Sequence, residues 1–124
     1  MSSQQPPNLE RILFTEEQIQ QRIKEVAAQI SDKYRDRNLK LIGVLKGSVF
    51  FLTALAREIS IPVKIDFLAI SSFANSVGTP GLVRIAKDLD EGIEGEDVLL
   101  VEDIVDTGFT TRYLLQTLAG RGPN

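Results

Sequence analysis

The 124-residue sequence contains no cysteine and no histidine. Without cysteine the chain has neither a disulfide framework nor a thiolate metal site, although its redox compartment stays open. Without histidine, Ser-His-Asp catalysis and the usual zinc sites are excluded. Any acid–base chemistry therefore falls to carboxylates or lysine.

A basic excess and long apolar runs are also missing. The formal net charge is −3 and no basic cluster occurs, which argues against a nucleic-acid partner. No apolar segment approaches the roughly 20 residues of a membrane span, which argues against a membrane partner. The first eight residues lack the charged and apolar parts of a signal peptide, so we expect a cytoplasmic protein. Neither a dinucleotide fingerprint nor a Walker-type phosphate loop is present.

The composition fits one globular domain. With 43% hydrophobic and 25% charged residues, a chain of this length can bury about two-thirds of its unfolded surface. Residues 1–8 are polar and contain two prolines, which predicts a flexible leader. Residues 9–124 form the predicted core domain.

Helix and strand patterns alternate along this core. Thr15 and Gln18 have the spacing of a capping box. They precede an apolar helix face made by Ile19, Ile23, Val26, Ala27 and Ile30. A strand at 41–45, a helix at 49–59 and a strand at 63–70 then form a βαβ unit. The predicted fold is an open, mainly parallel α/β sheet flanked by helices, with right-handed crossovers.

The most informative stretch, residues 98–111, reads VLLVEDIVDTGFTT. Its first four residues do not alternate with polar ones, which predicts a strand buried on both faces of a parallel sheet. Apolar residues continue at helical spacing up to Ala119, and Gly120 is a stop signal. Residues 106–111 should therefore form a turn that opens a helix at the carboxyl end of a strand. Ligands of open α/β sheets collect at this end.

Such a turn suits a phosphate. The first N–H groups of a helix have no intrahelical acceptor, and the helix dipole favours an anion there. Gly108 lets the backbone approach the anion, and the hydroxyls of Thr107, Thr110 and Thr111 can donate to it. Glu102 and Asp103, just before the turn, can accept protons from a sugar diol and share a hard cation. The alternative is that these acids are solvated loop residues and that Asp106 is an N-cap.

These residues resemble the phosphoribosyl pyrophosphate signature of the type I phosphoribosyltransferases, and VEDIVDTG is close to the form in the hypoxanthine-guanine branch. The resemblance implies that Glu102 and Asp103 hold the ribose hydroxyls and a magnesium ion. It implies that Asp106 is the general base for the purine N7 proton. Residues 106–111 would wrap the 5-phosphate, with Phe109 contributing its backbone N–H.

Two further segments acquire roles from this resemblance. Lys46, Gly47 and Ser48 follow the first strand, and taken alone they predict only a surface turn. In the family this is the pyrophosphate loop, which implies that Lys46 and Gly47 contact pyrophosphate and that the preceding peptide bond is often cis. Residues 71–81 are small and turn-forming, as in a mobile hairpin tip or a functional lid. The resemblance favours a lid that includes Ser71, Ser72 and Phe73.

The implied reaction is purine salvage. Phosphoribosyl would pass from phosphoribosyl pyrophosphate to hypoxanthine or guanine, giving IMP or GMP and pyrophosphate, in a homodimer or homotetramer. Family members continue with further strands and the residues that grip the purine, so we expect a core that is incomplete at its C-terminus. A non-catalytic module that binds phosphoribosyl pyrophosphate or a nucleotide is the alternative. A remote alternative is a dimeric aspartic protease, because residues 106–108 read Asp-Thr-Gly.

Overall fold

The computed structural model describes residues 13–72, 83–102 and 108–124, and within these ranges helices and strands alternate. Their order is α1 (Glu16–Lys33), β1 (Leu39–Val44), α2 (Ser48–Glu58), β2 (Val63–Ser72), β3 (Val83–Lys87), β4 (Asp97–Val101) and α3 (Phe109–Ala119). The predicted leader at 1–8 lies outside the described residues. No described helix is both long and apolar enough to cross a membrane.

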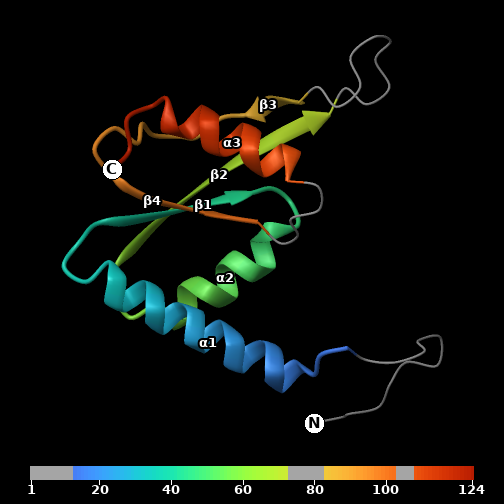
Figure 1. The fold of residues 1–124 in the computed structure, drawn as a ribbon, viewed down its shortest axis with the longest axis vertical. Helices are drawn as coiled ribbons and strands as arrows, with labels where there is room; N and C mark the ends of the chain where they lie inside the picture. The colour runs from blue at the N-terminus through green and yellow to red at the C-terminus, as the bar shows by residue number, and fades with distance from the viewer. Residues whose placement is uncertain (1–12, 73–82, 103–107) are drawn as a thin grey trace.

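The described strands form one sheet in the order β3-β2-β1-β4. β1 pairs in parallel with β2 and β4, whereas β3 is antiparallel to β2. The helices α1 and α2 cover one face, and α3 covers the other (Figure 1). The predicted mainly parallel α/β sheet is therefore confirmed.

The central strand β1 shows why the molecule has three layers. Its residues Leu41 and Ile42 are both fully buried but point to opposite faces, because successive side chains of a strand alternate. Leu41 belongs to the core under α1 and α2, which includes Leu52 and Leu55. Ile42 belongs to the core under α3, which includes Leu114. An apolar run without alternation is what burial on both faces requires.

Gly43 sets how closely α2 approaches the sheet. A Cβ at this position would lie 2.7 Å from Leu52 Cδ1 of α2 and 2.8 Å from Cε1 of Phe67, its neighbour on β2. No larger residue fits without movement of these side chains. Gly43 thus allows α2 to pack tightly beside the carboxyl end of β1.

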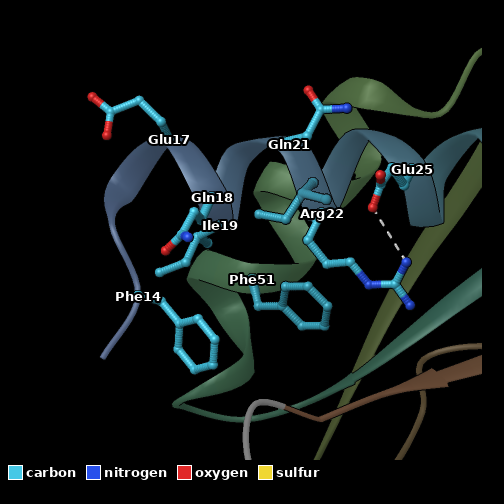
Figure 2. A pocket seen from close by; sticks show the side chains of 9 residues that line it. Phe14, Glu17, Gln18, Ile19, Gln21, Arg22, Glu25 and Phe51 are labelled. Atoms are coloured by element: carbon cyan, nitrogen blue, oxygen red, sulfur yellow. Dashed lines mark hydrogen bonds and ion pairs between the residues drawn. The ribbon is translucent and has the colours of Figure 1, made fainter. Parts of the chain in front are cut away.

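The capping box of α1 is confirmed. The N–H of Gln18 donates to Thr15 Oγ1 at 3.1 Å, and the N–H of Thr15 donates to Gln18 Oε1 at 2.8 Å. Of the predicted apolar face, Ile23, Ala27 and Ile30 are buried, whereas Ile19 is 50% exposed. Ile19 faces an open hollow of about 830 Å³ that Phe14 and Phe51 also line (Figure 2).

Two strands differ from the sequence-based expectation. β3 was not predicted: it is a short strand with two basic residues, and its pairing with β2 is not local. β4 was expected to be buried on both faces, but among its residues only Val101 is buried and the other four are half-buried. The reason is position, because β4 pairs only with β1 in the described sheet and lies at its edge.

Charged residues tie the β3–β4 connection to the amino ends of the strands. The side chain of Lys40 is 3% exposed, and its Nζ lies 3.0 Å from Glu96 Oε2 and 3.6 Å from Glu91 Oε2. Burial lowers the pKa of Lys40, but the close contact with Glu96 and the charges of Glu91 and Asp66 outweigh burial and raise it. The carboxylate of Asp66, also buried, accepts hydrogen bonds from the backbone N–H groups of Asp90 and Glu91.

The end of α3 is fastened to the same connection. Arg121 Nη1 donates to Asp88 Oδ1 at 2.7 Å, and Nη2 donates to Oδ2 at 3.0 Å. This pair, with the N–H of Leu89, lowers the pKa of Asp88. The Lys40 and Arg121 clusters both lie away from the carboxyl ends of the parallel strands β1, β2 and β4.

Candidate functional site

The carboxyl ends of β1, β2 and β4 meet at one edge of the sheet, because the strands run in parallel. Gly43 of β1 is level with Val101 of β4. The loop that follows β1 therefore lies beside Glu102, which follows β4. The first turns of α2 and α3 lie at this edge as well, on the right in Figure 1.

The loop between β1 and α2 is held at both ends. The N–H of Leu45 donates to Leu68 O at 2.9 Å, and the hydroxyl of the buried Ser48 donates to Val44 O. Between these anchors, Lys46 and Gly47 are exposed. The peptide bond between Leu45 and Lys46 is cis, as the resemblance implied. A positive side chain and nearby backbone are thus presented to solvent beside Glu102.

The amino end of α3 begins where the sequence indicated. Gly108 is the N-cap residue, with a φ of 86° and no side-chain cap. A Cβ there would meet nothing within 4 Å, so the backbone conformation, not space, favours glycine. The helix's first backbone bond runs from Arg112 N–H to Gly108 O at 2.9 Å. The N–H groups of residues 109–111 precede that bond and have no acceptor within the helix, as an anion site requires.

Glu102 is directed by a residue of this helix. The hydroxyl of Thr111 donates to Glu102 Oε2, and both residues are half-buried. The sequence analysis assigned that hydroxyl to the phosphate, whereas the structure places it on the carboxylate. The spacing of the two residues gives no signal of this contact, because it depends on where α3 lies relative to the end of β4.

The remaining predicted positions divide into two groups. Lys46, Gly47, Glu102 and the start of α3, including Thr110, come together at the edge just described. Other predicted residues lie outside the described residues, and these are Phe73, Asp103, Asp106 and Thr107.

Two residues of the predicted lid lie in the sheet. Ser71 and Ser72 belong to β2, and they pair with Arg84 and Val83 of β3. The rest of the predicted lid lies outside the described residues, so the lid stays a prediction.

The donor chemistry of the site suits magnesium. Carboxylate oxygens are hard donors, and magnesium is commonly bound by one or two carboxylates together with substrate oxygens. Glu102 supplies such a carboxylate, and Asp103 is the next residue in the sequence. Among the residues that the structure describes, no group of three or more His, Cys, Asp or Glu side chains could hold a metal by themselves.

Comparisons with known proteins agree with this geometry. The family described as "Phosphoribosyl transferase domain" matches residues 12–124. A hypoxanthine-guanine phosphoribosyltransferase of Mycobacterium avium is 48% identical over 124 residues, which cover 95% of this chain and 61% of that protein. The chain thus spans about three-fifths of the length of this curated relative.

Solved structures show the same likeness. A hypoxanthine phosphoribosyltransferase of Staphylococcus aureus has a TM-score of 0.86 and 40% identity, covering 94% of this chain and 63% of its own. The hypoxanthine phosphoribosyl transferase of Trypanosoma cruzi has a TM-score of 0.87 and 42% identity, covering 97% of this chain and 67% of its own. The parallel α/β sheet also removes the aspartic protease alternative, which requires an all-β surround.

Proposed function

The chain belongs to the phosphoribosyl transferase domain family, and we propose that it carries the phosphoribosyl half of a purine salvage enzyme. The enzyme would transfer phosphoribosyl from phosphoribosyl pyrophosphate to hypoxanthine or guanine. One observation carries the proposal: Glu102, the Lys46–Gly47 loop and the open start of α3 lie at one edge of the sheet. That edge offers acceptors for a diol next to donors for two phosphate groups.

Each end of the substrate would meet a group of matching chemistry. The 5-phosphate would accept the N–H groups of residues 109–111 and the hydroxyls of Thr107 and Thr110. The ribose hydroxyls would donate to Glu102 and Asp103. Pyrophosphate would lie on Lys46 and the backbone of Gly47, where a positive charge stabilises the leaving group.

The reaction would be a displacement at the anomeric carbon. A purine nitrogen forms a bond to that carbon, the bond to pyrophosphate breaks, and pyrophosphate leaves with the electron pair. The proton of purine N7 passes to Asp106, the proposed catalytic base. Magnesium held with Glu102 and Asp103 would neutralise charge on the pyrophosphate. A lid over the site that includes Ser71, Ser72 and Phe73 would exclude water from the reacting carbon.

The partners and setting of the enzyme are also proposals. The products would be IMP or GMP, and the assembly a homodimer or homotetramer. One relative's structure concerns the role of the C-terminal region on the oligomeric state and enzymatic activity of the Trypanosoma cruzi protein. A cytoplasmic location and the absence of nucleic-acid and membrane partners stay predictions.

A binding module without turnover is the second candidate. It is favoured by the fact that the groups described at this edge suit the ribose and the phosphates, which is all that binding requires. One assay separates the candidates: the purified protein is incubated with magnesium, phosphoribosyl pyrophosphate and hypoxanthine or guanine, and nucleotide is measured. Nucleotide formation supports the enzyme. Tight binding of phosphoribosyl pyrophosphate without nucleotide supports the module, and absence of both contradicts the proposed function.

A further inference from the structure

Thr111 and Glu102 connect two elements of the site. Glu102 follows the last residue of β4, whereas Thr111 lies in the first turn of α3. The Thr111 hydroxyl donates to Glu102 Oε2 across this gap. We propose that Thr111 is a positioning residue, which orients the Glu102 carboxylate so that Oε1 accepts a sugar hydroxyl. This inference rests on the proposed function.

The two side chains differ in conformational freedom, and this difference decides which of them orients the other. Glutamate has a long, flexible side chain and loses much rotamer entropy when its carboxylate is fixed. Threonine is branched at Cβ and restricted about χ1, and a helix restricts it further. Thr111 is therefore the fixed partner and Glu102 the one that is oriented. A carboxylate already oriented before the sugar binds makes binding tighter, because its ordering cost no longer falls on the binding step.

The surroundings make this hydrogen bond stronger than an exposed one. Glu102 and Thr111 line a hollow of about 440 Å³ whose other lining residues are apolar, among them Phe51, Val101 and Leu115. A hydrogen bond to a charged acceptor strengthens as the local dielectric falls. The carboxylate is thus held on its apolar side by one donor.

The contact also gives the two donors of Thr111, its hydroxyl and its backbone N–H, different acceptors. A threonine hydroxyl has one proton to donate, and here it donates that proton in the hydrogen bond to Glu102. The backbone N–H of Thr111 precedes the first helical bond among the described residues, and we propose that it donates to the 5-phosphate. One residue would thus serve the phosphate through its backbone and the ribose through Glu102.

The test measures binding of phosphoribosyl pyrophosphate in the presence of magnesium by titration calorimetry. Thr111→Val keeps the branched shape and removes the hydroxyl, and we expect Kd to rise roughly fivefold to tenfold. Thr111→Ser restores a hydroxyl and should bring Kd back to within about twofold of the wild type. In turnover assays, Thr111→Val should raise KM for phosphoribosyl pyrophosphate while kcat changes little, a split that loss of folding does not produce.

Thr117→Val is the matched control. Thr117 lies on the same helix, is half-buried, and donates its hydroxyl to Tyr113 O at 2.8 Å, away from Glu102. The Thr117→Val variant should bind phosphoribosyl pyrophosphate with the affinity of the wild type. The double variant Thr111→Val with Glu102→Gln should bind no more weakly than Glu102→Gln alone. Equal affinities of Thr111→Val and Thr117→Val, with the wild type binding normally, overturn the inference and leave the proposed function intact. No binding by the wild type overturns both.

Discussion

Replacement of Gly43 by alanine tests how closely α2, the helix that follows the Lys46–Gly47 loop, packs on the sheet. The added Cβ would lie 2.7 Å from Leu52 Cδ1 and 2.8 and 2.9 Å from two ring carbons of Phe67, closer than such atoms approach in proteins. Overpacking of this kind costs about 1–3 kcal/mol. Alanine regains about 0.5–1 kcal/mol in a strand, so the clash outweighs the gain. We expect a net loss of about 1–2 kcal/mol in the free energy of unfolding.

Urea unfolding followed by circular dichroism measures this loss, with Gly92→Ala as the control. A Cβ at Gly92 would meet nothing within 4 Å, so that variant should match the wild type. Leu52→Val in the Gly43→Ala background should recover part of the loss, because it removes the nearest methyl group. If Gly43→Ala is as stable as Gly92→Ala, the close packing of α2 on β1 is refuted.

Three further predictions concern charges. Lys40→Met should lower the free energy of unfolding by about 2 kcal/mol, because Glu96, only 27% exposed, loses its partner. The double variant Lys40→Met with Glu96→Gln should recover part of this loss in urea unfolding. No recovery would contradict the pairing. Because the pKa of Asp88 is lowered in the folded state, its small contribution should be present above about pH 4 and disappear as the pH falls through the lowered pKa. Thermal unfolding between pH 3 and 7 checks this, and Arg121→Gln should flatten that part of the profile. Asp106→Asn should depress turnover and leave binding of phosphoribosyl pyrophosphate within a few-fold by calorimetry. A large loss of binding would instead mean that Asp106 acts mainly in substrate binding, because the N-cap of α3 is Gly108.

Local patterns predicted most of the elements. The capping box at Thr15, the stop at Gly120 and the apolar runs of β1 and β2 depend on neighbours in sequence, and all four agree with the structure. β3 was missed because a five-residue strand is specified by its pairing with β2. The same pairing places Ser71 and Ser72 in β2.

The site was harder to predict at the level of single contacts. The motif around Glu102 predicts a phosphoribosyl ligand, but the partner of the Thr111 hydroxyl depends on how α3 lies relative to the end of β4. Lys40 shows the same limit, because an isolated lysine in an apolar run does not indicate the acids that surround it. Such contacts join distant segments, and periodicity carries no information about them.

The central claim is that the acids after β4 accept the ribose of phosphoribosyl pyrophosphate. Its most direct test is calorimetric titration of the wild type and of the double variant Glu102→Gln with Asp103→Asn, with and without magnesium. The account predicts magnesium-dependent binding by the wild type, and binding by the variant that is at least about tenfold weaker and insensitive to magnesium. Unchanged affinity of the variant, with magnesium dependence retained, would contradict it.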